Sequence, residues 1–342
     1  LLLIAAAAYL PYAGIPYFGD DYLFLSEHPY TSLYEYFVSY HDMGGEFRPF
    51  QMAWNALNQI LFGEGTFLLQ AGQVVLHALL AYLVFHFLTA NAIRPLASFI
   101  AAALLAVHPI GVLPILGNDS VSQVGGTLLG FLSFTLAWRY GRLLAEPVSE
   151  ACAGHRPGFG TALSSLAAFW LALLFKETSL SFAPILGLTV LYALWRCYRA
   201  GLWPAARKLG VLLLAYVLLV GLYFLYRHSM ASTVVAFGGT DPYAMRIGPN
   251  IVANEVLLLG AALLPVSTVD AFVAVSQRAL VTLAAMSVLA LAWGGLLIRG
   301  LMLGRAARPV AGLLILAMCA TMPAALMNHV SEAYAYNMAP FL

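Results

Sequence analysis

The stretch FLLQAGQVVLHALLAYLVFHFLT, residues 67–89, sets the class of fold because it contains no Asp, Glu, Lys or Arg. A helix of that length rises about 34 Å, which is enough to cross the roughly 30 Å hydrocarbon core of a bilayer. The whole chain of 342 residues agrees, since 62% of it is hydrophobic and only 9% is charged. A soluble domain could not cover its surface with so few polar groups. We therefore expect an integral membrane protein.

Charge and cysteine content exclude several other classes of protein. The net charge is +1, with 16 basic and 15 acidic residues, which argues against a polybasic protein that binds nucleic acid. The three cysteines, Cys152, Cys197 and Cys319, have neither the even number nor the close spacing of a disulfide framework or a zinc site.

Apolar runs of similar length recur along the chain and predict an all-α polytopic membrane protein with about 9 to 11 transmembrane helices. Besides 67–89, the expected spans are 1–12, 96–116, 121–138, 160–175, 179–195, 209–226, 279–298 and 310–328, and another begins near Tyr334. The first run has no charged segment before it and no cleavage site after it. We therefore expect a transmembrane helix of which the sequence contains only the later part, and not a signal peptide. Without repeats or linkers, residues 1–342 should form a single polytopic transmembrane domain that continues beyond one or both ends.

The distribution of charge predicts which side of the membrane each loop faces. If segment 251–266 does not cross the membrane, the loops on one side of the membrane hold eleven of the sixteen basic residues and only two of the fifteen acidic residues. Cytoplasmic loops show this excess of Lys and Arg. We therefore expect 251–266 to be a re-entrant or interfacial helix. The extracytoplasmic side then receives two long loops, 13–66 and 227–278, and thirteen acidic residues. These acids either form a functional surface or are there only because the charge rule does not exclude them.

Three carboxylates follow the extracytoplasmic ends of spans. Asp20 and Asp21 come after the first span, and Asp119 after the third, where Pro109 and Pro114 should interrupt the helix. Adjacent carboxylates can accept a proton from a hydroxyl, bind a divalent cation or cap a helix. The residue types alone leave these three alternatives open.

Cationic side chains on the same side could bind an anion. Lys176 and Glu177 lie between two spans with almost no loop, where a lysine can reach a lipid phosphate or pair with an acid in a turn. Arg246 and Arg278 in the second long loop could hold a phosphate or anchor lipid head groups. His108, about one turn inside the membrane, is either a hydrogen-bonded packing residue or a ligand.

The order of the motifs resembles a known family. They are the acidic pair after the first span, FRPF at 47–50, LQAGQVVLHALLAYLVF at 69–85, LLAVHPI at 104–110, GNDS at 117–120, FKET at 175–178 and SEAYAYN at 331–337. Together they resemble the C-class (GT-C) polytopic glycosyltransferases with lipid-phosphate sugar donors. The similarity is greatest to the transmembrane O-mannosyltransferases that carry tetratricopeptide repeats and to their bacterial relatives, and it covers nearly the whole chain.

The resemblance implies an enzyme of the bacterial inner membrane that works on the extracytoplasmic face. It would move a sugar, as a mannosyltransferase does, from an isoprenoid-phosphate donor to an acceptor protein or glycan. Catalytic residues would be Asp20, Asp21 and Asp119. Donor-phosphate-binding residues would be Lys176, Glu177, Arg246 and Arg278. Residues that line the site would be Arg48, His108, Glu332 and Tyr334. No cofactor is required, although the three aspartates could bind Mg²⁺ or Mn²⁺.

Two departures from the family pattern support an alternative. The family has Gly-Arg-x-Asp where this chain has Gly117-Asn118-Asp119, and Ser-Glu-Arg where it has Ser331-Glu332-Ala333. Both changes remove an arginine. The alternative is a catalytically inactive GT-C-fold subunit or scaffold of a larger membrane complex, because a fold does not establish an activity. A secondary transporter fits less well, since the second half of the chain does not repeat the first.

Overall fold

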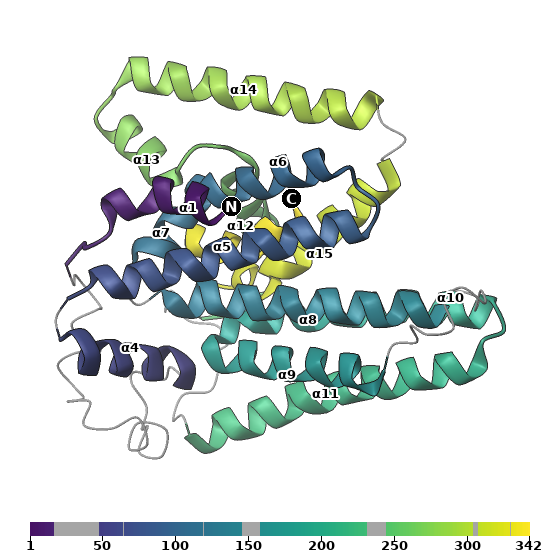
Figure 1. Cartoon of the computed structure of the whole chain (residues 1–342). Coiled ribbons are helices and arrows are strands. Elements are labelled where there is room, and N and C mark those ends of the chain that lie inside the picture. Colours follow the sequence, from purple (N-terminus) through teal and green to yellow (C-terminus); the bar gives the residue numbers. More distant parts are fainter. Residues whose placement is uncertain are drawn as a thin grey trace.

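The computed structural model describes residues 1–16, 48–63, 65–118, 120–145, 158–230, 244–303, 307–328 and 330–342. Within these ranges the chain is helical and has no strand; Met245 and Met327 form one isolated antiparallel bridge. Most of the long helices run side by side, as Figure 1 shows. The predicted all-α class is therefore confirmed for the described residues.

The helices of the first two thirds of the chain include every predicted span up to residue 226. They are α1 (Leu2–Tyr9), η1 (Leu10–Tyr12), α4 (Pro49–Phe62), α5 (Phe67–Ala90), α6 (Pro95–Val107), η2 (Pro109–Gly111), α7 (Val112–Leu116), α8 (Val121–Ala145), α9 (Phe159–Phe175), η4 (Glu177–Ser181), α10 (Phe182–Arg199) and α11 (Trp203–Met230).

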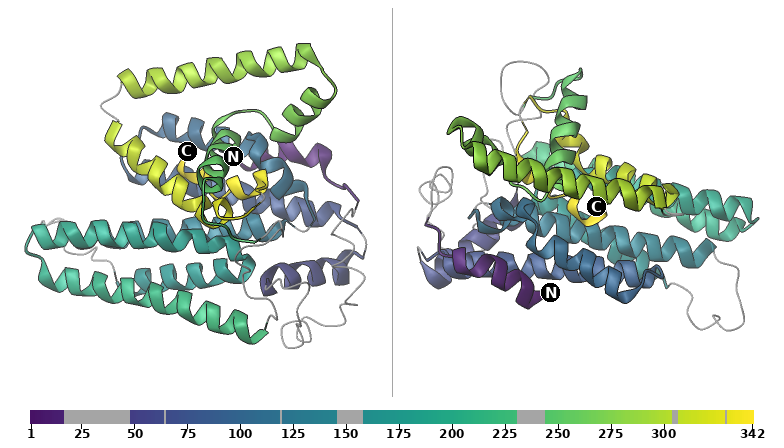
Figure 2. Two further views of the ribbon diagram at one scale, coloured as in Figure 1. Left: turned by 180° about the vertical axis from the view of Figure 1, so that it is seen from behind. Right: turned by 90° about the horizontal axis from the view of Figure 1, so that it is seen from above.

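The last third adds two long helices and several short ones. They are α12 (Asn250–Leu263), α13 (Thr268–Ser276), α14 (Leu280–Leu303), α15 (Ala307–Ala325), α16 (Glu332–Ala335) and η5 (Ala339–Phe341). In the left view of Figure 2, α14 lies along the upper edge of the molecule, and it contacts α13 and α15.

Four helical segments in the described residues are long and apolar enough to cross a membrane: α5, α8, η4 with α10, and α11. The pair α6 and η2–α7, bent by 47° at His108, makes a fifth if it counts as one span. Shorter apolar helices occupy the other predicted spans, in α1, α9, α14 and α15. The chain is therefore an all-helical membrane protein, while the number of 9 to 11 spans stays a prediction.

Two helices extend well beyond the spans expected from the sequence. The expected span 121–138 is part of α8, which continues to Ala145, and 209–226 is part of α11, which begins at Trp203. Hydropathy marks only the apolar part of a helix. Arginine and lysine side chains let the helix continue into the head-group region, because their apolar stems stay in contact with lipid while their charged ends reach water.

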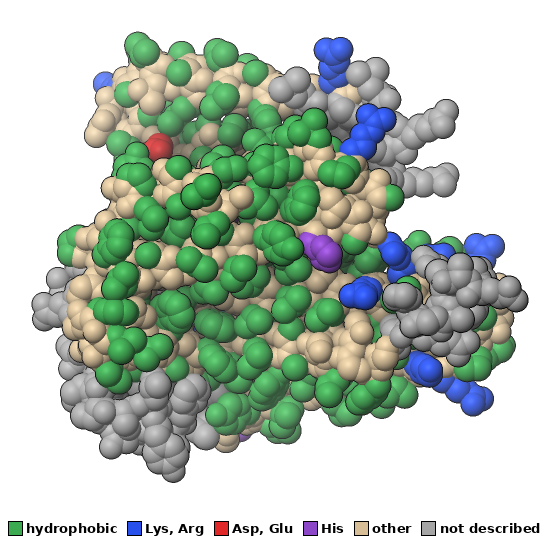
Figure 3. Space-filling view, viewed as in Figure 1, with side chains coloured by type: hydrophobic (Ala, Val, Ile, Leu, Met, Phe, Trp, Pro, Cys, Tyr) green, Lys and Arg blue, Asp and Glu red, His purple; other side chains and the backbone are tan. Residues whose placement is uncertain are grey.

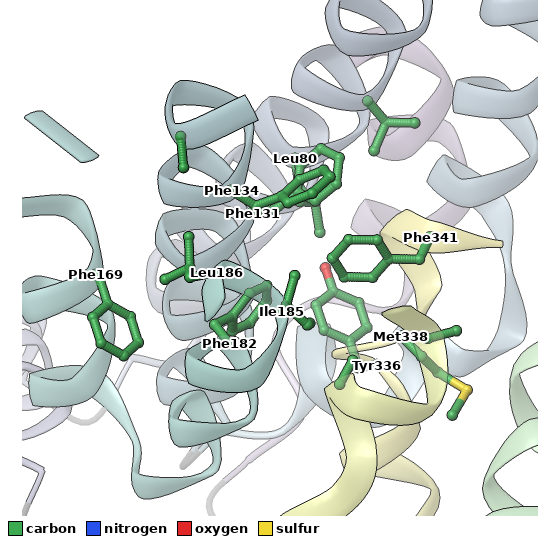
Figure 4. Packing of buried hydrophobic residues seen from close by; sticks show 14 of the residues in the cluster. Leu80, Phe131, Phe134, Phe169, Phe182, Ile185, Leu186, Tyr336, Met338 and Phe341 are labelled. Carbon is green, nitrogen blue, oxygen red and sulfur yellow. The ribbon is translucent and has the colours of Figure 1, made fainter. Parts of the chain in front are cut away.

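Helix α8 packs closely against its neighbours because glycines line its contacts. A Cβ at Gly130 would overlap the Phe182 ring of α10, and one at Gly141 would lie 2.7 Å from the Ala193 Cβ. Such small residues let helix backbones approach in a membrane, where van der Waals packing replaces the hydrophobic effect. Phe131 of α8 and Phe341 of η5 form part of an aromatic core that Figure 4 shows from close by.

The surface shows the pattern of a membrane-embedded protein. Exposed Leu and Val side chains cover α11, for example Val211, Leu218 and Leu225. On the face in Figure 3, hydrophobic side chains cover most of the described helices, and most of the Lys and Arg side chains gather at one end. The chain order explains this, since α8 and α10 end, and α9 and α11 begin, at that end. We call it the basic end.

Helix α12 has only 14 residues and so rises about 21 Å, less than a bilayer core. Its buried Asn254 donates from Nδ2 to the carbonyl oxygens of Ala325 and Met327, at 3.0 and 2.8 Å. Its buried Glu255 accepts a hydrogen bond from the Thr321 hydroxyl. These bonds fasten α12 to the end of α15. Whether the segment is re-entrant or interfacial stays a prediction.

Candidate functional site

The sequence Phe-Lys-Glu-Thr places two charged residues in the break between α9 and η4. Lys176 has an extended backbone there, with φ −158° and ψ 141°, and it ends α9 and precedes η4. Helix α9 begins at the basic end, so this break lies at the opposite end of the bundle. Lys176 is 9% exposed, which means that its ammonium group lies in a largely desolvated position.

Arg48 and Glu177 form a bidentate ion pair across this break. Arg48 Nε donates to Glu177 Oε2 at 3.0 Å, and Arg48 Nη2 donates to Oε1 at 2.6 Å. The exposed fractions of the two side chains are 10% and 22%. Pro49 fixes the start of α4 and so leaves Arg48 just before the helix. The sequence placed both residues near a site, but it did not predict that they pair.

Two further cations lie close enough to act on the Glu177 carboxylate, namely Lys176 and Arg227 near the end of α11. Together with Arg48 they leave an excess of two positive charges among these four described residues. The Lys176 ammonium also lies 5.7 Å from the centre of the Tyr334 ring, so the segment after α15 reaches the same place. We call Arg48, Lys176, Glu177 and Arg227 the cationic cluster.

A buried amide network fixes η4, which begins with Glu177 of the cationic cluster. The Asn337 Oδ1 accepts hydrogen bonds from Gln123 Nε2 at 2.6 Å and from the Thr127 hydroxyl at 2.5 Å. Its Nδ2 donates to the Thr178 carbonyl oxygen at 3.3 Å and lies 3.4 Å from the Ser181 hydroxyl. One side chain from the segment after α15 thus joins α8 to η4, the 3₁₀ helix that begins with Glu177.

Gln70 of α5 joins the start of the first long loop to the end of α7. Its Oε1 accepts from the Gly14 backbone N–H at 2.6 Å, and its Nε2 donates to the Ile15 carbonyl oxygen and to Asn118 Oδ1. The Asn118 Nδ2 donates a hydrogen bond to the Pro16 carbonyl oxygen at 3.4 Å. Pro16 and Asn118 therefore lie in contact although 102 positions separate them.

The proposed catalytic acids flank this contact in the sequence but lie outside the described residues. Asp20 and Asp21 follow Pro16, and Asp119 follows Asn118. The described residues therefore bring together the two segments from which these acids continue. The positions of the three carboxylates stay a prediction.

The remaining predicted site residues lie in several places. His108 Nδ1 accepts from the Ile110 backbone N–H, and its carbonyl oxygen accepts from the Tyr9 hydroxyl, so it stabilises the break between α6 and η2. Arg246 and Arg278 are both exposed, and no described contact joins them to the cationic cluster. Tyr334 contacts Lys176, as stated above, while the Glu332 side chain is outside what the structure describes.

The sequence did not reveal a row of amide side chains on α4. The row consists of Gln51, Asn55, Asn58 and Gln59. Because successive residues of a helix are 100° apart, these four positions fall within an arc of about 100°, which also includes Arg48. The spacing of these amides after FRPF is a signal that could have found the row. We call it the α4 amide row.

Several polar atoms on this helix are buried without a protein partner. Asn55 Oδ1, Gln59 Oε1 and the neighbouring Trp54 Nε1 make no hydrogen bond in the structure. Buried polar groups are nearly always hydrogen-bonded, so such atoms indicate a water molecule or a polar ligand. Amides both donate and accept, as hydroxyl groups do, and the α4 amide row therefore suits a hydroxyl-rich molecule.

Comparisons of the chain with protein-family models, curated proteins and solved structures found no match. The resemblance of the motifs to the GT-C class thus stands on the residues themselves.

Proposed function

We propose that the chain is a GT-C-type glycosyltransferase that moves a sugar from an isoprenoid-phosphate donor to a hydroxyl of an acceptor protein or glycan, on the extracytoplasmic face. The cationic cluster carries this proposal. Three cations gather round one carboxylate at the end of the bundle opposite the basic end. A lipid phosphate at a low-dielectric site needs such charge-assisted donors.

Within this proposal, Glu177 is a positioning residue. Its carboxylate engages Arg48 through two bonds and so fixes the guanidinium. Lys176 and Arg227 are the cations that would contact the donor phosphate. The α4 amide row, which begins beside Arg48, would hydrogen-bond the hydroxyl groups of the sugar or of a glycan acceptor.

The chemical step transfers a glycosyl group between oxygens. The acceptor oxygen forms a bond to the anomeric carbon, and the bond from that carbon to the phosphate oxygen breaks. The leaving lipid phosphate keeps the electron pair, which Lys176 and Arg227 stabilise. The acceptor proton passes to Asp20 or Asp21, and Asp119 orients the acceptor.

A divalent cation would fit this proposal if the three aspartates converge. Within the described residues, no three His, Cys, Asp or Glu side chains form a group that could hold a metal ion. Asp20, Asp21 and Asp119 lie outside that search. Carboxylate oxygens are the ligands that Mg²⁺ and Mn²⁺ prefer.

Binding of an isoprenoid phosphate tests the cationic cluster. The purified protein in detergent is titrated with a short-chain polyprenyl phosphate, and the dissociation constant is compared for wild type, Lys176→Gln and Arg227→Gln. Each variant loses one charge-assisted contact, so we expect affinity to fall by about tenfold. The control is Arg207→Gln, an exposed arginine at the basic end, which should bind as wild type does. Equal affinity of all four proteins would overturn the assignment of the phosphate site.

The inactive scaffold is the second candidate function, and one observation favours it. Asn118 occupies the position of a family arginine and is engaged by Gln70 and the Pro16 carbonyl oxygen, as a structural residue would be. The double variant Asp20→Asn, Asp21→Asn separates the two functions. Loss of sugar transfer with isoprenoid-phosphate binding retained supports the enzyme. Sugar transfer absent from both proteins supports the scaffold, and transfer equal to that of an active wild type contradicts the catalytic role of the two aspartates.

A further inference from the structure

At the basic end, α8 and α10 border a shallow groove whose cavity is only about 10 Å³, so that a head group would lie over the groove and not inside it. The two helices meet at Gly141 and Ala193, where the absence of a side chain on the glycine allows the close approach. Arg142 of α8 and Arg196 of α10 line the groove on either side of this contact. Both arginines are only partly exposed.

One wall of the groove is aromatic. The Trp138 and Tyr192 rings stack with an interplanar angle of 1° and a centroid distance of 6.1 Å. The Trp138 indole N–H donates to Asn91 Oδ1 at 2.8 Å, which fixes the ring at the end of α5. Since both residues line the groove, they form a flat, half-apolar surface next to the arginines.

Neighbouring aromatic residues show that this wall lies at the level of a membrane interface. Tyr192, Trp195, Tyr198 and Trp203 are all about half exposed at the end of α10 and the start of α11. Tryptophan and tyrosine gather at the head-group level of a bilayer because their rings combine an apolar body with a polar group. The groove therefore opens where lipid phosphates lie.

Charge decides which kind of lipid fits. Among the described residues, those that line the groove include two arginines and no Asp or Glu. Arg196 makes no ion pair with any acid in the described part of the chain. Arginine binds phosphate through a planar fork of donors, and basic pockets between helices are known binding sites for anionic head groups.

We infer that the arginines at the mouth of this groove bind the phosphate head group of one anionic phospholipid, whose acyl chains lie along the apolar surfaces of α8 and α10. This site is separate from the cationic cluster, which lies at the opposite end of the bundle. The inference does not rest on the proposed glycosyltransferase function.

Native mass spectrometry of the detergent-solubilised protein tests the inference. Wild type is titrated with phosphatidylglycerol and, separately, with phosphatidylcholine. We expect one phosphatidylglycerol per chain to bind about tenfold more tightly, because the zwitterionic lipid does not provide net negative charge. Equal affinities for the two lipids would overturn the inference, whatever the variants do.

Variants then locate the site. Arg196→Gln should lose most of the preference for phosphatidylglycerol, whereas Arg207→Gln, an exposed arginine at the same end, should keep most of it. Lys176→Gln should keep the preference, since it lies at the other end. Equal effects of Arg196→Gln and Arg207→Gln would show diffuse attraction and would also contradict the inference.

A soluble head group distinguishes a lipid from a free phosphate compound. Glycerol 3-phosphate has the same phosphate chemistry without acyl chains. We expect it to compete only weakly, because it gains nothing from the apolar surfaces of the two helices. Competition as strong as that of phosphatidylglycerol would contradict a lipid occupant.

Discussion

Replacing Glu177 with glutamine would leave Arg48, Lys176 and Arg227 close together without the described carboxylate that now lies among them. Removing one partner of a buried ion pair costs about 3 to 5 kcal/mol. The Glu177 side chain is 22% exposed. We therefore expect a loss near the lower limit, about 3 kcal/mol of unfolding free energy.

The reciprocal change should cost less because the charges are not balanced. In Arg48→Gln, the carboxylate still has Lys176 and Arg227 near it. We expect a loss of about 2 kcal/mol, and a coupling energy between the two positions of about 1 to 2 kcal/mol in the double variant.

Unfolding in mixed detergent micelles, followed by circular dichroism, measures all three free energies. The matched control is Glu255→Gln, another buried carboxyl, whose described partner is the Thr321 hydroxyl and not a cation. Glutamine can still accept that hydrogen bond, so the control should lose no more than about 1 kcal/mol. A coupling energy below about 0.5 kcal/mol, or a greater loss for Arg48→Gln than for Glu177→Gln, would refute the reasoning.

Two further predictions concern the packing that positions the site. Gly130→Ala would force a methyl group into the Phe182 ring and should cost about 1 to 3 kcal/mol in the same unfolding assay. Its control is Gly187→Ala on α10, which has open space at the Cβ and should be neutral or slightly stabilising; equal effects would contradict the packing argument. Asn337→Leu would leave buried polar groups on α8 and η4 unsatisfied. It should destabilise the protein by about 2 to 4 kcal/mol and reduce isoprenoid-phosphate affinity, and unchanged stability would show that the network is dispensable.

Hydropathy predicted the helices well because a membrane span is a local property. A run such as 67–89 needs only its own apolar side chains to define a helix, and α5 begins and ends within one residue of the prediction. Pro109 likewise marks a break in the helix from local chemistry alone. The ends of α8 and α11 were predicted less well, because charged residues outside the apolar segment continue the helices.

The site was only partly predictable because its contacts join distant segments. Local sequence indicated that Lys176 and Glu177 lie between two spans, but nothing in it pairs Arg48 with Glu177 across 129 positions. The same holds for the contact between Asn337 and Gln123. Without a three-dimensional structure, an amide side chain in an apolar segment is seen only as an isolated polar residue, and its hydrogen-bond partner cannot be identified.

The buried position of Asn337 has a consequence for biogenesis. The segment 331–341 is synthesised after every helix that it packs against, and until it arrives Gln123 and Thr178 lack an amide partner between the buried ends of α8 and η4. The earlier helices must therefore enter the bilayer with a polar gap between them. A ribosome-stalled nascent chain that stops before this segment should be open to proteolysis and should be recognised by membrane quality control, whereas a chain that includes it should resist both.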